Sequence, residues 1–356
     1  MTGPLVSVTD LQTHFPIRRG LLRRQVGAVR AVDGVSFTID KGRTLGLVGE
    51  SGCGKTTVGR SLLRLVEPTA GEVRFAGADV RATRGAALRT LRRRMQIVFQ
   101  DPYGSLNPRM TVRAILEEGL VIHRLGGPAE RLDRMAGALE RTGLARAALD
   151  RYPHEFSGGQ RQRIAIARAL VLGPEFLVLD EPISALDVSI QAQVVNLLVE
   201  LRGQFGLTYL FISHDLSVVE YVADDVAVMY LGRIVERAPA ERLCRQPLHP
   251  YTHALFSAVP AIDPARRRRI LLPGDVPSPA RPPAGCRFHP RCPLAEPACR
   301  TIDPPATTVD GHLVHCHVAA REMAAAGCDA ASATIAKRLA AAEPAGMAEP
   351  PAETID

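Results

Sequence analysis

Short blocks of continuous apolar residues alternate along this chain with longer segments in which apolar residues recur at helical spacing. The blocks have the length and composition of buried strands; they are Thr44–Val48, Gln96–Gln100, Phe176–Asp180 and Tyr209–Ser213. The helical segments are Thr57–Leu65, Arg161–Leu172 and Ser189–Arg202. Strands that alternate with helices in this order form a mostly parallel sheet with helices on both faces. The pattern therefore predicts an α/β fold.

The remaining segments have different patterns. Residues 5–48 are predicted to form short strands, of which Val35–Ile39 shows clear alternation. Residues 111–152 carry Ala, Leu, Arg and Glu at helical spacing with breaks at Gly126–Pro128 and Gly143, which predicts a small helical insertion. From Gln246 onward the chain becomes rich in proline. A helix is predicted at Ala330–Ala342, and the last dozen residues are expected to be disordered.

The charge balance leaves several classes of partner open. The chain has 356 residues and a formal net charge of +7, carried almost entirely by arginine because lysine occurs only at Lys41, Lys55 and Lys337. No basic patch is interleaved with aromatic residues, which disfavours nucleic acid. The basic runs 92–94 and 266–269 are interpreted mainly as solvated faces, with contact to a membrane surface or an acidic partner as the alternative. No signal peptide or membrane-spanning run is recognisable, so we expect a cytosolic protein, with docking on a membrane left open.

A glycine-bearing loop follows the first buried strand and precedes a helix. Its sequence satisfies the phosphate-loop template G-x4-G-K-T in the required strand–loop–helix context; the residues are Gly49, Glu50, Ser51, Gly52, Cys53, Gly54, Lys55, Thr56 and Thr57. Backbone N–H groups of such a loop surround the β-phosphate of a nucleotide, and the helix N-terminus adds partial positive charge. Lys55 is expected to reach the β- and γ-phosphates and Thr56 to bind Mg²⁺. A chance turn is disfavoured because lysine is so rare here.

Polar residues at the ends of other strands suit phosphoryl transfer. Asp180 can contribute to the Mg²⁺ shell and Glu181 can polarise the attacking water. His214 can contact the γ-phosphate, and Gln100 can contact the metal or the water. Alone, the acidic pair could also be a helix cap, and a lone histidine would usually be structural; the phosphate loop favours catalysis for the acidic pair, and the strand-end position raises the case for His214. Cys53 fills a small slot, but at a helix N-terminus its thiolate is favoured, and we expect its alkylation to block ATP binding.

In this order these motifs resemble the nucleotide-binding subunits of ABC transporters. The resemblance covers about residues 5–257 and rests also on Ser157-Gly-Gly-Gln160 and Ser184-Ala-Leu-Asp187. It implies a P-loop NTPase (RecA-like) core with an antiparallel β subdomain and a helical subdomain at about 101–165 that contacts membrane subunits. It further implies that Asp187 lies at a dimer seam and that an aromatic residue near the N-terminus stacks on adenine, for which Phe15 is the candidate. The signature loop would bind the ATP of a partner subunit; its residues are Ser157, Gly158, Gly159 and Gln160.

The second half of the chain narrows the resemblance to oligopeptide/dipeptide importers. His249-Pro-Tyr-Thr252, 272–277 and 285–293 look like their C-terminal extension, here placed at 258–320 and followed by an Ala/Pro-rich tail at 321–356. The resemblance implies a peripheral ATPase on the cytoplasmic face of the cell membrane. Its partners would be two permease subunits, a second ATPase subunit (a heterodimer, with a homodimer as the alternative) and, indirectly, an extracytoplasmic solute-binding protein. Nickel and glutathione importers share much of the pattern, and a non-transport ABC ATPase is a remote alternative.

Four cysteines cluster in this extension. Cys286, Cys292, Cys299 and Cys316 offer the four thiolates that a [4Fe–4S] cluster or tetrahedral Zn²⁺ needs. Their spacing lacks the close Cys-x2-Cys pair of most zinc sites, and the resemblance favours iron–sulfur. Free thiols remain a third interpretation.

Overall fold

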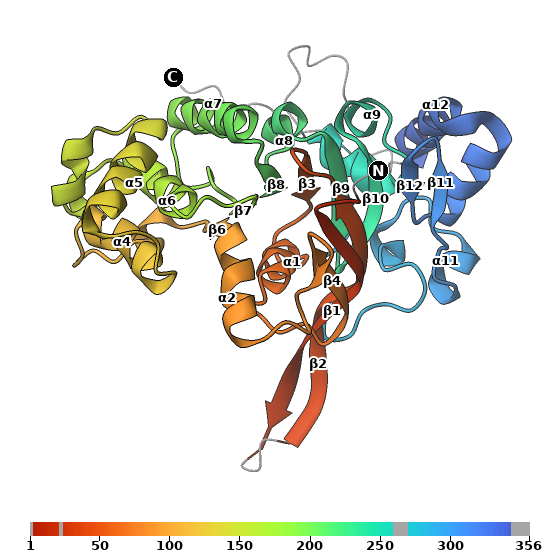
Figure 1. Cartoon of the computed structure of the whole chain (residues 1–356). Helices are drawn as coiled ribbons and strands as arrows, with labels where there is room; N and C mark the ends of the chain where they lie inside the picture. Colours follow the sequence, from red (N-terminus) through yellow and green to blue (C-terminus); the bar gives the residue numbers. More distant parts are fainter. Residues whose placement is uncertain (1–2, 21–23, 259–269, 343–356) are drawn as a thin grey trace, which may run out of the picture. The chain divides into compact units, whose positions relative to one another are not determined.

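The computed structural model describes residues 3–20, 24–258 and 270–342. The predicted basic run at 266–269 and the predicted disorder of the last dozen residues lie outside this range. The chain, drawn in Figure 1, divides into two compact units. Unit 1 comprises Met1–Glu241 with Pro277–Pro282, and unit 2 comprises Arg242–Val276 with Pro283–Asp356.

A mostly parallel sheet lies at the centre of unit 1, as the sequence predicts. Within the unit its strands follow the order β10-β9-β3-β8-β7-β6, and only β10 runs antiparallel to its neighbour. The strands are β3 (Thr44–Val48), β6 (Met95–Val98), β7 (Phe176–Asp180), β8 (Thr208–Ile212), β9 (Asp225–Tyr230) and β10 (Arg233–Pro239). Strands β3, β7 and β8 are buried along their whole length, which explains their continuous apolar sequences.

An antiparallel sheet of order β2-β1-β4-β5 forms the second layer of unit 1. Its strands are β1 (Val6–Arg19), β2 (Arg24–Ile39), β4 (Ala70–Phe75) and β5 (Ala78–Asp79). The prediction of only short strands at 5–48 was wrong, because β1 and β2 have 14 and 16 residues. Only the second half of β2 alternates between buried and exposed positions. Its first half is solvated on both faces and, paired with the end of β1, extends past β4 and β5 as a two-stranded ribbon (Figure 1). It therefore lacks the alternation that signals a strand.

The helices of unit 1 include the predicted insertion. They are α1 (Lys55–Leu62), α2 (Gly85–Arg94), α3 (Pro102–Ser105), α4 (Val112–Ile122), α5 (Pro128–Arg141), α6 (Gly158–Leu170), α7 (Val188–Phe205) and α8 (Leu216–Val222), with 3₁₀ turns at Arg146–Asp150 and Pro153–Glu155. Helix α9 (Ala240–Arg245) lies at the boundary between the units in the sequence. Helices α4, α5 and α6 pack on one another (Figure 1). No helix in the described part of the chain is long and apolar enough to cross a membrane.

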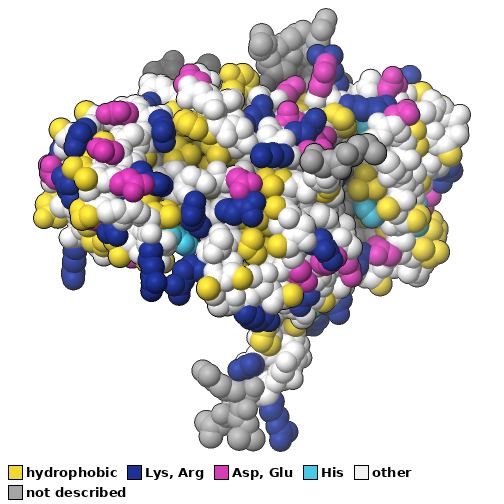
Figure 2. Space-filling model, in the orientation of Figure 1, with side chains coloured by type: hydrophobic (Ala, Val, Ile, Leu, Met, Phe, Trp, Pro, Cys, Tyr) yellow, Lys and Arg dark blue, Asp and Glu magenta, His cyan; other side chains and the backbone are white. Residues whose placement is uncertain are grey.

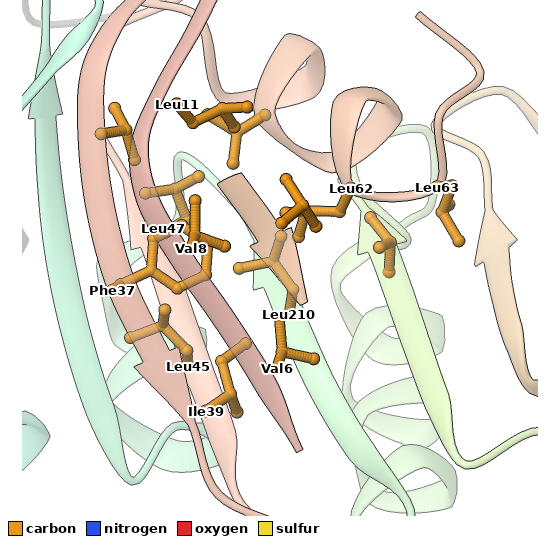
Figure 3. Packing of buried hydrophobic residues seen from close by; sticks show 14 of the residues in the cluster. Val6, Val8, Leu11, Phe37, Ile39, Leu45, Leu47, Leu62, Leu63 and Leu210 are labelled. Atoms are coloured by element: carbon orange, nitrogen blue, oxygen red, sulfur yellow. The ribbon is translucent and has the colours of Figure 1, made fainter. Parts of the chain in front are cut away.

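One apolar core joins the two sheets of unit 1 around α1. Leu45 and Leu47 of β3 lie beside Phe37 of the antiparallel sheet, and Leu210 of β8 lies beside Leu62 of α1 (Figure 3). Each of these side chains is at most 3% exposed, and burying a side chain of this size stabilises the fold by about 1.5–3 kcal/mol. The core therefore fixes the end of β3 and the start of α1, between which the glycine loop lies.

Helix α1 also packs closely on β7. A Cβ atom on Gly59 would come within 2.7 Å of Val178 Cγ1. Only glycine allows this approach, which places the start of α1 beside the carboxyl end of β7.

The basic run Arg92–Arg94 ends helix α2 and is less solvated than predicted. Arg92 donates to the carbonyls of Leu63 and Arg64 at 3.3 and 2.6 Å. Arg94 pairs with Glu175 at 2.5 and 3.1 Å. Two of the three side chains therefore hold unit 1 together.

Unit 2 has its own small core. Its elements are α10 (Pro250–Ser257), a 3₁₀ turn at His289–Arg291, α11 (Pro297–Thr301), the hairpin β11 (Thr307–Val309) and β12 (His312–Val314), and α12 (His317–Ala342). Helix α12 includes the predicted segment and is interrupted at Gly327, whose φ is 78°. The buried side chains of α12, among them Met323, Ile335 and Leu339, pack with Leu248 and Val314.

Candidate functional site

The glycine loop between β3 and α1 has a backbone that only glycine allows. Gly49 and Gly54 have φ values of 150° and 110°. A Cβ atom at either position would lie 2.1 Å from a carbonyl oxygen, that of Met229 or Ala31. Gly54 is the N-cap of α1 and makes no side-chain cap bond, so the first N–H groups of α1 are available to an anion such as phosphate.

Lys55 lies folded against this loop. Its side chain is 5% exposed, and its ammonium group donates to the carbonyls of Gly49 and Glu50 at 2.7 and 3.0 Å. The charge is therefore held where a phosphate on the loop would meet it, as the sequence predicts for a phosphate-loop lysine.

Thr56 and Asp180 meet at the carboxyl end of β7. The Thr56 hydroxyl donates to Asp180 Oδ1 at 2.8 Å. Asp180 is 1% exposed, and its Oδ2 is buried without a hydrogen-bond partner among the described residues. Burial raises the pKa of Asp180, and the hydrogen bond from Thr56 partly offsets this. A hydroxyl beside a buried carboxylate oxygen with a free lone pair is a donor set that fits Mg²⁺.

Glu181 follows Asp180, and two side chains from the ends of the neighbouring strands contact its carboxylate. Gln100 donates its amide to Glu181 Oε2 at 2.8 Å, and His214 Nδ1 lies 3.3 Å from the same oxygen. The Glu181 side chain is 15% exposed and that of His214 is 62% exposed. Glu181 has a φ of 47°, a conformation that side-chain-bearing residues rarely adopt. The structure thus brings together the three residues that the sequence nominates for catalysis.

The Ser157 loop forms the exposed start of α6. Ser157 and Gln160 make a capping box, in which Gln160 N donates to Ser157 Oγ at 3.4 Å and Ser157 N donates to Gln160 Oε1 at 3.1 Å. Gly159 is buried against Ile190 of α7. The contact is so close that a Cβ atom on Gly159 would lie 2.4 Å from Ile190 Cγ2. The Ser157 hydroxyl thus stands at the N-terminus of a 13-residue helix.

Asp187 and Phe15 are both exposed. Asp187 is the N-cap of α7 without a side-chain cap bond, and Phe15 is 41% exposed on β1. In the described part of the chain, no hydrogen bond or ion pair links Ser157, Asp187 or Phe15 to the phosphate loop.

Cys53 differs from the sequence-based expectation. Its side chain is 4% exposed, and burial raises the pKa of the thiol although Lys55, with its Nζ 3.8 Å from the sulfur, acts in the opposite direction. The predicted preference for a thiolate was therefore wrong, because desolvation outweighs the helix N-terminus and the ammonium group.

The four late cysteines lie near one another in unit 2. Burial raises the pKa of Cys286 to about 11 and of Cys316 to about 12. Burial also raises the pKa of Cys292, and the neighbouring Cys316, Cys286 and Cys299 raise it further. Even so, no group of three or more His, Cys, Asp or Glu residues in the described ranges is arranged to hold a metal ion. The structure therefore does not support the predicted cluster or zinc site.

Fold and site together define an ATP-binding-cassette ATPase, and comparisons with known proteins agree. A sequence family described as "ABC transporter" matches residues 32–184. Among solved structures, the ATP-binding cassette MJ0796 bound to ADP and Pi covers 66% of this chain and 98% of its own, at 26% identity and a TM-score of 0.59. The cassette protein cbiO1 of Clostridium perfringens covers 67% of this chain and 90% of its own, at 27% identity and a TM-score of 0.58.

Curated relatives and a second family model, which matches the second half of the chain, identify the type of ABC protein. The description "Oligopeptide/dipeptide transporter, C-terminal region" matches residues 235–299. The oligopeptide transport ATP-binding protein AppF of Bacillus subtilis is 52% identical over 88% of this chain and 97% of its own length. A putative peptide import ATP-binding protein of Brucella ovis is 57% identical over the same shares. This chain belongs to the family of ATP-binding proteins of oligopeptide/dipeptide ABC transporters; it is an ABC ATPase, and its nucleotide is ATP.

The sequence alone did not single out every residue at this site. Gln191 contacts the loop after Glu181, and His14 Nε2 lies 2.8 Å from Asp33 Oδ1 near Phe15. Both contacts join residues that are apart in the sequence and meet only in the folded chain, so the sequence does not reveal them. The sequence signal for Gln191 is its place in Ser189-Ile-Gln-Ala-Gln193, a segment after Asp187 that resembles oligopeptide/dipeptide importer ATPases, but the segment alone does not assign it a role.

Proposed function

We propose that this chain hydrolyses ATP to energise the import of di- or oligopeptides through an ABC transporter. The observation that carries the proposal is the convergence of Thr56 with Asp180, and of Gln100 and His214 with Glu181, beside the phosphate loop. The peptide substrate is supported by relatives named for oligopeptide transport and peptide import, 97% of whose length is matched.

Each side chain receives a role from its position. Lys55 exchanges the carbonyls of Gly49 and Glu50 for phosphate oxygens, and the N–H groups at the start of α1 bind the β-phosphate. Thr56 and Asp180, with Gln100, would hold Mg²⁺, which when bound would neutralise charge on the phosphate oxygens.

Glu181 is the proposed general base. Gln100 and His214 occupy its Oε2, so Oε1 is left to orient and polarise the water that attacks the γ-phosphate. His214, whose side chain is 62% exposed, also contacts the γ-phosphate.

The site is completed by a second ATPase subunit. The exposed cap Ser157, with Gly159, binds the γ-phosphate held by the partner, Asp187 lies at the seam, and Phe15 stacks on adenine. The exposure of Ser157, Asp187 and Phe15 supports this assignment. The partner is a different ATPase subunit, and a second copy of this chain is the alternative.

The remaining partners follow from the relatives. We assign residues 5–257 to the ATPase domain, 258–320 to the importer-type extension and 321–356 to the tail. The helical segment at about 101–165 contacts two permease subunits, so the chain lies peripherally on the cytoplasmic face of the membrane, and a solute-binding protein delivers the peptide outside. In a reconstituted transporter, ATP turnover should rise when peptide-loaded binding protein is added. Stimulation by nickel or glutathione instead would refute the proposed peptide substrate and leave the proposed ATPase activity in place.

The catalytic assignment is tested by Glu181→Gln. General-base removal should lower kcat by about 10²–10⁴-fold and trap an ATP-bound dimer, visible by size-exclusion chromatography with ATP. Glu200→Gln, an exposed position on α7, is the matched control and should behave as wild type. Near-normal turnover in Glu181→Gln would refute the assignment.

The four thiols of unit 2 remain a finer hypothesis. The proposed group is a [4Fe–4S] cluster, with Zn²⁺ as the alternative, although the thiols of the described residues are not arranged as a ligand shell. Iron, sulfide and zinc analysis of anaerobically purified protein decides between cluster, zinc and free thiols, and absorbance near 400 nm would accompany only the cluster.

A further inference from the structure

The loop between Glu181 and Asp187 is held by one side chain from the following helix. Gln191 Nε2 donates to the carbonyl of Leu186 at 2.9 Å and to that of Ile183 at 3.2 Å. Gln191 lies in the second turn of α7 and is half-buried. A single amide thus spans most of the loop that connects the proposed base to the proposed dimer seam.

The start of the loop is also tied to β8, because Glu181 N donates to Ile212 O at 2.9 Å, and Ile183 is buried. The loop's own bonds are short-range turns: Ser184 donates to the carbonyl of Glu181 through N at 3.3 Å and through Oγ at 3.1 Å, and Leu186 N donates to Ile183 O at 3.1 Å. Glu181 also has a positive φ of 47°, which a residue with a side chain keeps only when its surroundings fix it. Gln191 connects these turns to a long helix.

The start of α7 is itself firmly placed. Ile190 packs against Gly159 so closely that a Cβ atom there would approach to 2.4 Å. Gln193 accepts a hydrogen bond from Arg163 Nη2 at 3.2 Å. Gln191 therefore reaches the catalytic loop from a helix turn that is fastened to α6, the helix that begins with the Ser157 loop.

We propose that Gln191 is a positioning residue for ATP hydrolysis: its two hydrogen bonds hold the 181–187 loop in the conformation that aims Glu181 at the attacking water. The proposal rests on the proposed role of Glu181. Because Gln191 touches neither the phosphate loop nor Thr56, its loss affects the hydrolytic step and leaves ATP binding in place.

Two replacements separate the hydrogen bonds from other effects. Gln191→Met keeps the length of the side chain and removes the donor, and Gln191→Glu keeps its shape and replaces the donor with an acceptor. Methionine is a strong helix former and glutamate suits the start of a helix, so neither weakens α7 by itself. Gln204→Met and Gln204→Glu, at an exposed position in the last turn of the same helix, are the matched controls.

The assay is steady-state ATP hydrolysis by the full chain, with its partner ATPase subunit where turnover requires one. Both Gln191 variants should lower kcat about tenfold, which corresponds to roughly 1.4 kcal/mol in the activation barrier. KM for ATP should stay within about twofold and the melting temperature within a few degrees of wild type. The Gln204 variants should match wild type in all three quantities.

A double mutant distinguishes positioning from a general structural role. If Gln191 acts through Glu181, adding Gln191→Met to Glu181→Gln should not lower the residual rate further, since residues that act as a unit are non-additive. A further tenfold loss in the double mutant, a wild-type kcat in Gln191→Met, or equal changes in kcat and KM would each overturn the proposal. Normal turnover in Glu181→Gln alone would instead refute the proposed base and leave the contacts of Gln191 without a catalytic role.

Discussion

The ion pair between Arg94 and Glu175 fixes the start of strand β7, which ends in the acidic pair of the site. The guanidinium makes two bonds to the carboxylate, Nε to Oε1 at 2.5 Å and Nη2 to Oε2 at 3.1 Å. It also lies 4.9 Å from the centre of the Phe75 ring. Glu175 N donates to Arg94 O at 2.9 Å. Because the pair joins the chain before β6 to the chain before β7, we expect Glu175→Gln to destabilise unit 1.

The magnitude follows from geometry and exposure. A hydrogen bond to a charged group contributes about 1.5–3 kcal/mol, but these side chains are 34% and 35% exposed, so solvent screening reduces the value to about 1 kcal/mol. For a unit of this size that lowers the melting temperature by about 2–4 °C. Asp150→Asn removes the partner of Arg113 from a pair whose carboxylate is 72% exposed, and this control should cost only about 0.2–0.5 kcal/mol.

The effect should depend on pH in one direction. The hydrogen bond from Arg94 lowers the pKa of Glu175 below its ordinary 4.5, so the folded state binds fewer protons there than the unfolded state. The stabilisation is therefore complete above about pH 4.5 and is lost as pH falls through the folded-state pKa. Urea unfolding of both proteins at pH 7.5, 5.5 and 4.0 measures the difference. A difference that is equal at all three values, or no larger than that of Asp150→Asn, would refute this reasoning.

Two further predictions concern the phosphate loop. Cys53 should react with iodoacetamide at pH 7.5 far more slowly than a free thiol, because burial raises its pKa, and any labelled fraction should fail to bind a fluorescent ATP analogue; rapid labelling that leaves binding intact would contradict both parts. Gly54→Ala combines a φ of 110° with a Cβ atom 2.1 Å from Ala31 O, so strain of about 1–3 kcal/mol should lower the melting temperature by roughly 2–12 °C and abolish ATP binding. Gly52→Ala, which meets no atom within 4 Å but has a φ of 78°, should show the strain without the clash, and calorimetry with ATP separates the two.

The parts of the fold that could be predicted are those in which burial requires a recognisable run of apolar residues. Strands β3 and β7 are buried on both faces, and the predicted ranges Thr44–Val48 and Phe176–Asp180 agree with the structure. The polar residues that end such strands must meet at one edge of a parallel sheet, so Gln100 and Glu181 could be placed together before their contact was seen.

The parts that could not be predicted depend on tertiary context. The solvated half of β2 has no alternation of apolar and polar residues, so the length of the hairpin formed by β1 and β2 could not be predicted from the sequence. The basic run at the end of α2 carries no sign that Arg92 and Arg94 bind carbonyls and a carboxylate. For Cys53, the helix N-terminus could be read from the sequence, but the burial that reverses its effect could not.

The phosphate loop and the Ser157 loop require their glycines for different physical reasons. In the phosphate loop, Gly49 and Gly54 adopt backbone angles closed to other residues, so glycine shapes the surface that meets phosphate. In the Ser157 loop, Gly159 is a helical residue that is small because Ile190 of α7 needs the space. The first loop is thus built to face a ligand, whereas the second is built to stay fixed to the helix whose Gln191 holds the catalytic loop. A closure that moves Ser157 onto a neighbouring nucleotide would therefore carry α6 and the start of α7 together.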